Sequence, residues 1–322
     1  MFFKNMRVLV AGGTGLIGTP LSRLLLEQGA RIRVASKENK PRAHPDAEFI
    51  QTDLTDYKNC LSVCRDMEYV FNLLCIKGTP EMAATRPLDM FEPMVLFNTN
   101  LARAAFQCGA KGYLYTSSVG VYQPAEILYE EDVWNKTYPS EKDWYSGWAK
   151  RMGEIQIEAY RKQHNWNTAI VRPSNVYGPL DNFNPKSALF MAYIIGRFAE
   201  KISPIITAGD GLQVRDYIHA DDAARGLILA AENSAGPINL CSGRETTNRE
   251  VIEILAKNSE YKPSIVYDTS KPSGDRRRVL DVSKIRSLGF EPKISLEEGI
   301  MSTLKWYKEN SDTTSQRFNM FK

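Results

Sequence analysis

The fold is decided by residues 8–18, which read Val8-Leu9-Val10-Ala11-Gly12-Gly13-Thr14-Gly15-Leu16-Ile17-Gly18. An apolar run that predicts a strand over residues 7–11 leads into the glycines, and a helical pattern follows them. Gly12 suits a tight turn, and Gly15 admits a close approach of the backbone to a pyrophosphate. Gly18 lets the helix pack against the strand while its first amides face the phosphates. The stretch therefore predicts a dinucleotide-binding turn.

Strands and helices alternate after this turn. Further strands are predicted over residues 31–36, 48–52, 69–75, 113–118 and 167–172. A helical stretch carries Phe97, Leu101 and Ala105 on one face, and another spans residues 150–161. The alternation predicts an α/β fold with a doubly wound parallel sheet, whose ligands bind beyond the carboxyl ends of the strands. Past Pro173 the pattern becomes irregular, which predicts a smaller C-terminal lobe.

Composition excludes several classes of partner. The chain has 322 residues, with 41 basic and 38 acidic side chains, so nothing favours nucleic-acid or membrane binding. The first strand begins too close to Met1 for a cleavable signal, and no apolar run reaches the roughly 20 residues of a membrane span. We expect a cytoplasmic protein. Its five cysteines are scattered, as in reduced proteins. Cys60 and Cys64 have no metal-ligating partner nearby and are interpreted as packed thiols, so no metal is expected.

Six motifs occur in order along the chain. They are Gly12-x-x-Gly15-x-x-Gly18, Asp53-Leu54-Thr55-Asp56, Ser117-Ser118-Val119-Gly120-Val121-Tyr122, Lys150-Arg151-Met152-Gly153-Glu154, Arg172-Pro173-Ser174-Asn175-Val176-Tyr177-Gly178-Pro179 and Arg215-Asp216-Tyr217-Ile218-His219-Ala220-Asp221-Asp222. Together they resemble the extended short-chain dehydrogenase/reductase family of nucleotide-sugar epimerases and dehydratases, from Met6 to about Tyr307. The resemblance implies a Rossmann sheet and a nicotinamide cofactor that takes a hydride from a sugar carbon and usually returns it.

The resemblance also implies a division of labour along the chain. Residues 1–175 are expected to form the dinucleotide-binding Rossmann domain, and residues 219–243 are expected to return to it. Residues 176–218 and 244–322 are then the substrate-binding lobe, which would hold a nucleoside-diphosphate sugar over the nicotinamide.

The cofactor-binding residues follow from matched positions. They are Gly12, Thr14, Gly15, Leu16, Ile17, Gly18, Ser36, Lys37, Asp53, Leu54, Lys150 and Pro173. Asp53 resembles the residue that accepts a hydrogen bond from the adenine amino group. The alternative interpretation is that Asp53 caps the helix that follows Thr55.

The end of the second predicted strand bears on the choice between NADP and NAD. Ser36 stands where an acidic residue would bond the ribose hydroxyls of NAD. Lys37, Lys40 and Arg42 can pair with a 2′-phosphate, or they form an exposed basic loop. The pattern favours NADP, whereas Glu38 leaves NAD open.

The expected catalytic residues are Ser118, Tyr145 and Lys150. In the family a tyrosinate accepts the hydroxyl proton, assisted by a lysine four residues later and by a serine or threonine. Ser118 and Lys150 match, but Ser146 stands four residues before the lysine. Tyr145 stands five before it, about 140° away around a regular helix, unless the helix starts late or bulges at Gly147. Tyr145 is therefore either the base or a packing residue, with a water relay through Ser146 and Lys150 as the competing acceptor.

Four residues are expected to bind the substrate: Lys77, Asn175, Arg215 and Arg278. Asn175 and Arg215 resemble family residues beside the phosphates and the nucleotide, and Arg278 or Arg276 resembles the late arginine that closes on the pyrophosphate. Lys77 follows the fourth strand on the nicotinamide side, or it is a surface lysine.

These residues predict an NAD(P)-dependent nucleoside-diphosphate-sugar epimerase. Val119 and Gly120 stand where a 4,6-dehydratase would carry an Asp-Glu pair, which argues against dehydration. The alternatives are a 4-keto-sugar reductase, or a catalytically altered NAD(P)-binding sensor or scaffold. The apolar stripe of Phe97, Leu101 and Ala105, with the aromatic helix over residues 144–160, predicts a homodimer.

Overall fold

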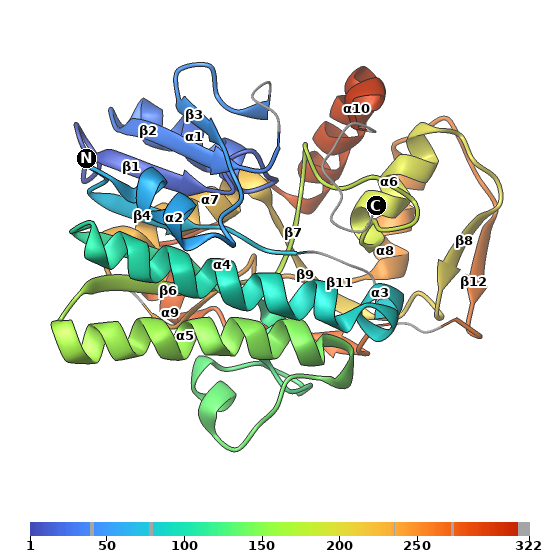
Figure 1. Ribbon diagram of the computed structural model, residues 1–322. Helices are drawn as coiled ribbons and strands as arrows, with labels where there is room; N and C mark the ends of the chain where they lie inside the picture. Colours follow the sequence, from blue (N-terminus) through green and yellow to red (C-terminus); the bar gives the residue numbers. More distant parts are fainter. Residues whose placement is uncertain (39–41, 77–79, 235, 272–273, 315–322) are drawn as a thin grey trace.

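A seven-stranded parallel sheet forms the centre of the protein (Figure 1). The structure is a computed structural model that describes residues 1–38, 42–76, 80–234, 236–271 and 274–314. Its strand order is β10-β6-β5-β4-β1-β2-β3, and all six strand pairs are parallel. The strands are β1 (Arg7–Ala11), β2 (Arg31–Ser36), β3 (Glu48–Gln51), β4 (Tyr69–Asn72), β5 (Gly112–Thr116), β6 (Asn167–Pro173) and β10 (Ile238–Leu240).

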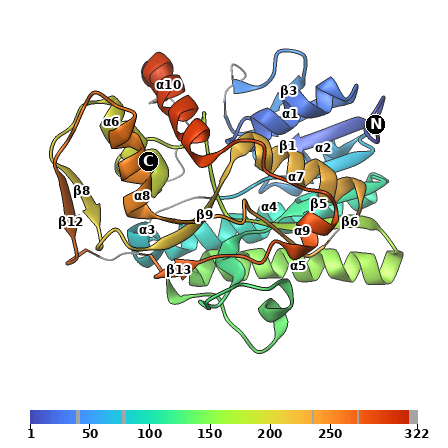
Figure 2. The ribbon, with the colours of Figure 1, turned by 180° about the vertical axis from the view of Figure 1, so that it is seen from behind.

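Helices cover both faces of this sheet (Figures 1 and 2). One face carries α1 (Gly18–Glu27) and α7 (Ala220–Glu232), and the other carries α2 (Tyr57–Cys64), α4 (Pro87–Gln107) and α5 (Trp144–His164). Alternation along β1 explains the two layers, because Val8 and Val10 join the core beneath α1 whereas Leu9 and Ala11 join the core beneath α4. The predicted doubly wound α/β fold is confirmed.

The last strand of the sheet comes from a distant part of the chain. Ile238 of β10 pairs with Val171 of β6, and α7, just before β10, packs on α1. Between β6 and α7 the chain leaves the sheet and forms part of a smaller lobe.

This lobe lies beside the carboxyl edge of the sheet (Figure 1, right). It contains β7 (Asn175–Tyr177), α6 (Phe190–Ala199), β8 (Ile205–Ala208), β9 (Val214–His219), β11 (Glu245–Thr247), α8 (Asn248–Lys257), β12 (Ile265–Asp268), β13 (Arg277–Arg278) and α10 (Leu296–Thr314). Strands β7, β9, β11 and β13 form one sheet, and β8 pairs with β12. The short helices α3 (Pro80–Thr85) and α9 (Ser283–Ser287) flank the two parts.

The predicted strands differ from the observed ones mainly at their carboxyl ends. The strand expected to reach Cys75 ends at Asn72, because the Asn72 Oδ1 accepts the amide of Leu74 at 3.0 Å and turns the chain. The Asn72 Nδ2 also donates to the Tyr113 hydroxyl at 2.9 Å. A polar side chain thus ends the strand where the site begins.

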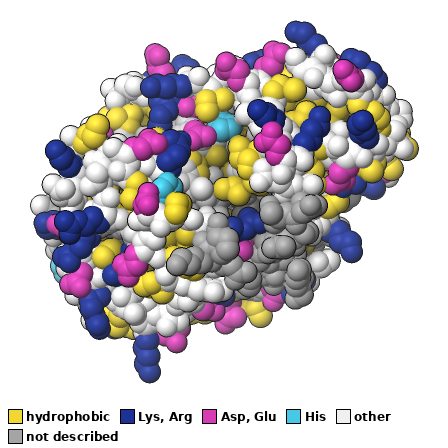
Figure 3. Space-filling model, turned by 90° about the horizontal axis from the view of Figure 1, so that it is seen from above, with side chains coloured by type: hydrophobic (Ala, Val, Ile, Leu, Met, Phe, Trp, Pro, Cys, Tyr) yellow, Lys and Arg dark blue, Asp and Glu magenta, His cyan; other side chains and the backbone are white. Residues whose placement is uncertain are grey.

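The surface carries both signs of charge. In Figure 3, lysines and arginines are interspersed with acidic side chains over the face that is shown. Within the described residues, no helix combines the length and the apolar character needed to cross a bilayer.

Candidate active site

The glycine turn after β1 has the geometry of a phosphate cradle. Gly12 has φ of +81°, and a Cβ on Gly18 would lie 2.3 Å from the Gly12 carbonyl oxygen. Helix α1 begins after Ile17 without a side-chain cap, and its first turn holds no acidic residue. The first amides of α1 therefore have no competing side-chain acceptor, and the turn fits the diphosphate of a dinucleotide.

The end of β2 continues this cradle. The Thr14 and Ser36 hydroxyls are 2.7 Å apart and buried. The Lys37 Nζ lies 2.8 Å from the Asp53 carboxylate. Burial raises the pKa of Asp53, but hydrogen bonds from Lys37 and Thr55 outweigh burial and hold it below its ordinary value.

Asp53 is not the cap of α2. That alternative is wrong, because the cap is Asp56, whose carboxylate accepts the amide of Lys58 at 2.8 Å. Leu54, the residue after Asp53, is buried. Lys40 lies outside the described residues.

Lys150 lies at the carboxyl edge of the sheet. Its side chain projects from α5, is 2 % exposed, and donates to the carbonyls of Leu74 at 3.0 Å and Thr116 at 2.7 Å. These carbonyls follow β4 and end β5, so the ammonium bridges two neighbouring strands. Burial lowers the pKa of Lys150. The amine is fixed where the Rossmann arrangement presents a ligand.

Ser118 lies on the turn that follows β5. Its Oγ accepts the Gly120 amide at 3.1 Å and caps the short helix η2 (Val119–Val121). A Cβ on Gly147 of α5 would lie 2.4 Å from the Gly120 carbonyl oxygen, so only glycine allows this contact. The start of α5 is thereby docked directly on the Ser118 turn.

Tyr145 lies on a different side of α5 from Lys150. Helix α5 begins at Trp144, so Tyr145 is already in its first turn and the late start is absent. The Tyr145 side chain is part of an apolar cavity of about 330 Å³ lined also by Phe91, Trp144, Trp148 and Met152. Ser146, one turn before Lys150, donates its hydroxyl to the Asp143 carbonyl at 3.3 Å. Tyr145 and Lys150 are not brought together.

Two arginines from neighbouring strands of the lobe lie side by side. Arg215 of β9 is in register with Arg278 of β13. Burial and the adjacent Arg278 cation lower the pKa of Arg215. Its Nη1 donates to the Val214 carbonyl at 2.7 Å, and no carboxylate of the described residues forms an ion pair with it. Such a pair of cations suits a doubly charged anion.

Arg278 is the inward member of the basic run. Its side chain is 17 % exposed and forms ion pairs with Asp275 and with Asp143, the residue before α5. Burial lowers the pKa of Arg278, but the two carboxylates outweigh burial and raise it. Arg276 is 62 % exposed and pairs with Asp210.

Most of the chain matches a known protein family. The family model described as "NAD dependent epimerase/dehydratase family" matches residues 8–241. The chain belongs to the NAD-dependent epimerase/dehydratase family. The match spans the glycine turn, the Ser118 turn, Lys150 and Arg215.

The similarity to individual members of the family extends over nearly the whole chain. GDP-L-fucose synthase 1 of Arabidopsis thaliana is 30% identical over 315 residues, 95% of this chain and 94% of that protein. GDP-L-fucose synthase of Escherichia coli (strain K12) is 28% identical, over 96% and 98% of the two chains. The structure of UDP-glucose 4-epimerase from Thermotoga maritima with UDP-glucose has a TM-score of 0.85 and 25% identity, over 95% of this chain and 100% of that one.

The other expected site residues of this NAD-dependent epimerase/dehydratase family member are placed as follows. Asn175 begins β7 and donates its Nδ2 to the Asp216 carbonyl at 3.1 Å, beside the arginine strands. Pro173 ends β6, and Leu16 is buried beneath the glycine turn. Lys77 lies outside the described residues.

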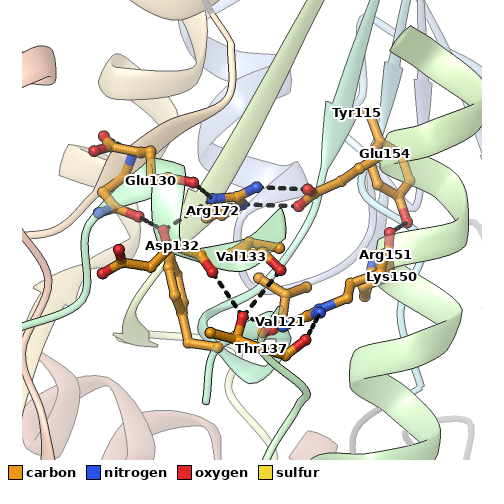
Figure 4. A network of polar contacts seen from close by, with 12 residues as sticks. Tyr115, Val121, Glu130, Asp132, Val133, Thr137, Lys150, Arg151, Glu154 and Arg172 are labelled. Atoms are coloured by element: carbon orange, nitrogen blue, oxygen red, sulfur yellow. Dashed lines mark hydrogen bonds and ion pairs between the residues drawn. The ribbon is translucent and has the colours of Figure 1, made fainter. Parts of the chain in front are cut away.

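A buried ion pair fixes α5 to the sheet (Figure 4). The Arg172 guanidinium of β6 donates two hydrogen bonds to the Glu154 carboxylate of α5, at 2.9 and 2.6 Å, and neither side chain is exposed. Arg172 also donates to the Glu130 carbonyl at 2.8 Å. Because Glu154 lies one turn after Lys150, this pair holds the part of α5 that carries Lys150.

Arg151 fixes the segment between the Ser118 turn and α5 in the same way (Figure 4). Its guanidinium donates to the carbonyls of Val121 at 2.8 Å and Thr137 at 2.6 Å. Tyr122 packs rather than reaching the site, because its hydroxyl donates to Asn239 Oδ1 at 2.6 Å and the side chain is 4 % exposed.

Two thiols noted in the sequence lie in α2. Cys60 and Cys64 are buried, and burial raises the pKa of Cys60 to about 12. Across the described part of the chain, no three His, Cys, Asp or Glu side chains are placed to hold a metal ion.

Sequence reasoning did not single out Asp143, which belongs to none of the six motifs. Its carboxylate accepts a hydrogen bond from the nearby Ser140 hydroxyl at 3.3 Å, but its other contacts, Gly120 and Arg278, are remote in sequence. The sequence signal that could have found Asp143 is its position two residues before Tyr145.

Proposed function

We propose that this protein is an NAD(P)-dependent epimerase of nucleoside-diphosphate sugars that acts by transient oxidation of the sugar. The observation that carries the proposal is the buried Lys150 amine, held between the ends of β4 and β5 beside the Ser118 turn. A surface or purely structural lysine has no need of this placement. The Arg215 and Arg278 pair supplies the complementary site for a diphosphate.

The proposal keeps the division of the chain that the sequence predicts. We assign residues 1–175 and 219–243 to dinucleotide binding, supported by the pairing of β10 with β6. We assign residues 176–218 and 244–322 to the substrate, supported by the two arginines in the described part of this lobe.

In this proposal the bound nicotinamide supplies the hydride acceptor. The amides after Gly12 hold the cofactor diphosphate, and the Ser118 hydroxyl bonds the reacting sugar hydroxyl. Lys150 contributes a fixed positive charge that favours the oxyanion as the hydroxyl loses its proton. Arg215 and Asn175 orient the nucleotide end, so that one sugar carbon faces the cofactor.

Three finer expectations belong to the same proposal. NADP is favoured over NAD, because Ser36 replaces an acidic residue and Lys37 lies beside it. A homodimer through α4 and α5 is favoured by the exposed apolar side chains of Met152 and Ile155. A location in the cytoplasm rests on the sequence alone.

The test is a panel of GDP- and UDP-sugars, with epimer formation followed by NMR. The parent is expected to interconvert a pair of epimers without net consumption of cofactor. Lys150→Met should lower the rate by roughly 10²–10⁴-fold, whereas Lys162→Met, an exposed lysine of the same helix, should not. Net oxidation of NADPH by a 4-keto sugar would instead identify a reductase. Failure of every sugar to reduce the bound cofactor would leave the sensor or scaffold interpretation.

A further inference from the structure

An acidic side chain contacts the Ser118 turn. Asp143 ends the short helix η4 (Glu141–Asp143) and directly precedes α5. Its carboxylate carbon lies 3.3 Å from where a Cβ on Gly120 would be, so the carboxylate packs over the Gly120 Cα. The Gly120 amide donates to Ser118 Oγ at 3.1 Å. Ser118 and Asp143 thus converge on one glycine.

The proposed oxidation needs a proton acceptor, and the usual one is displaced. Tyr145 lines the apolar cavity together with Phe91 and Met152. The Lys150 ammonium donates to two carbonyls, and the Ser146 hydroxyl donates to a third. A carboxylate is ionised at neutral pH and accepts a proton directly, which an alcohol does not.

The Asp143 carboxylate is engaged in an ion pair with a guanidinium group. Arg278 forms an ion pair with Asp143 and a second with Asp275, and the three side chains are 12–25 % exposed. Arg278 also neighbours Arg215. The diphosphate of a nucleotide sugar carries two negative charges and can contact both cations at once, so its binding competes with Asp143 for Arg278.

We propose that Asp143 is the proton acceptor of this site, and that a substrate diphosphate activates it by drawing Arg278 away. The inference rests on the proposed function. In the oxidation the carbinol C–H bond breaks, and its electron pair leaves as hydride to the oxidised nicotinamide. The O–H proton passes to the Asp143 carboxylate while the carbon–oxygen double bond forms. Return of the hydride to the opposite face of the carbonyl carbon, with return of the proton from Asp143 to the oxygen, gives the epimer.

Substrate binding and proton acceptance are thereby coupled. In the free protein the Asp143 carboxylate is engaged by Arg278. A diphosphate that takes Arg278 frees this carboxylate to accept the proton of the sugar hydroxyl.

Two measurements on Asp143→Asn test this. Asparagine keeps the shape of the side chain but removes its charge and its basicity. Calorimetric titration with GDP and with UDP, without sugar, should show affinity about 3- to 10-fold higher than in the parent, because one competitor for Arg278 is gone. Single-turnover reduction of bound cofactor by a reactive nucleotide sugar should be slower by roughly 10²–10⁴-fold.

The matched control is Glu141→Gln, which removes one negative charge from the same short helix. Among the described residues Glu141 forms no ion pair and is exposed, so neither measurement should change. A merely structural Asp143 would weaken nucleotide binding and turnover together.

Several outcomes overturn the proposal. Unchanged or weaker nucleotide binding by Asp143→Asn shows that Arg278 is not exchanged, and a retained single-turnover rate shows that Asp143 is not the acceptor. Loss of rate in Tyr145→Phe or Ser146→Ala, with Asp143→Asn unaffected, assigns the proton to those residues. The nucleotide titration needs no turnover, so an inactive parent contradicts the proposed function separately.

Discussion

We expect the choice of cofactor to depend on the ion pair between Lys37 and Asp53. Lys37 is tied to Asp53 at 2.8 Å, and Ser36 is tied to Thr14. A 2′-phosphate placed at the end of β2 would exchange a carboxylate partner of Lys37 for a more highly charged one. An adenosine without this phosphate gains nothing from Lys37.

We therefore expect NADP to bind more tightly than NAD, and Lys37→Ala to narrow the difference. One phosphate contact is worth about 1–3 kcal/mol, so the loss for NADP is about 5- to 150-fold, with little change for NAD. Calorimetric titration of both cofactors measures it, with Lys162→Ala as the control. Tighter binding of NAD by the parent would contradict the preference.

Helix α5 and strand β6 are joined by the Arg172–Glu154 pair, which is fully buried. Removing one partner of such a pair leaves a charge without compensation in the interior, whereas replacing both with apolar residues can be neutral. Each side chain of the pair is therefore stable in the interior only while the other is present.

Glu154→Gln is expected to lower the free energy of unfolding by about 3–5 kcal/mol, measured by urea denaturation. The double variant Glu154→Met, Arg172→Met should recover much of this stability, because no buried charge is left alone. A loss below about 1 kcal/mol in the single variant would mean that water reaches Arg172.

Elements of the sheet were predictable because their signals are local. The apolar run that ends at Ala11 and the glycines after it specify a strand, a turn and a helix without reference to the rest of the chain. The start of α5 was not predictable in this way. Whether Tyr145 faces Lys150 depends on the contact of Gly147 with Gly120, which is long-range. Asp143 was missed for the same reason, since its contacts with Gly120 and Arg278 join it to two other parts of the chain.

At the scale of the whole molecule, one outer face is conspicuously apolar. Exposed side chains on α4 and α5 include Leu88, Leu96, Trp144, Tyr145, Met152 and Ile155. Two helices of one copy can pack against the same helices of a second copy around a two-fold axis, which would cover the apolar face of both. This arrangement would also shield the cavity that holds Tyr145.

We expect the protein to be a dimer at micromolar concentration, and Met152→Glu with Ile155→Glu to give a monomer, because burying two charges in the interface is unfavourable. Light scattering measures the mass. Val266→Glu, at an exposed apolar position of the lobe, should leave the dimer intact. A monomeric parent would refute the assembly.

Strand β10 lies far along the chain from its partner β6, so the ribosome synthesises it well after the other strands of the sheet. A nascent chain that has emerged only to Pro173 has an unpaired β6 edge and lacks α7, whose residues complete the core beneath α1. At about 5–20 residues per second, translation from there to Leu240 takes on the order of 3–13 s. During that interval the open strand edge can pair with other chains. Chaperone binding to emerging chains should therefore be concentrated in this window and decline once α7 and β10 have emerged.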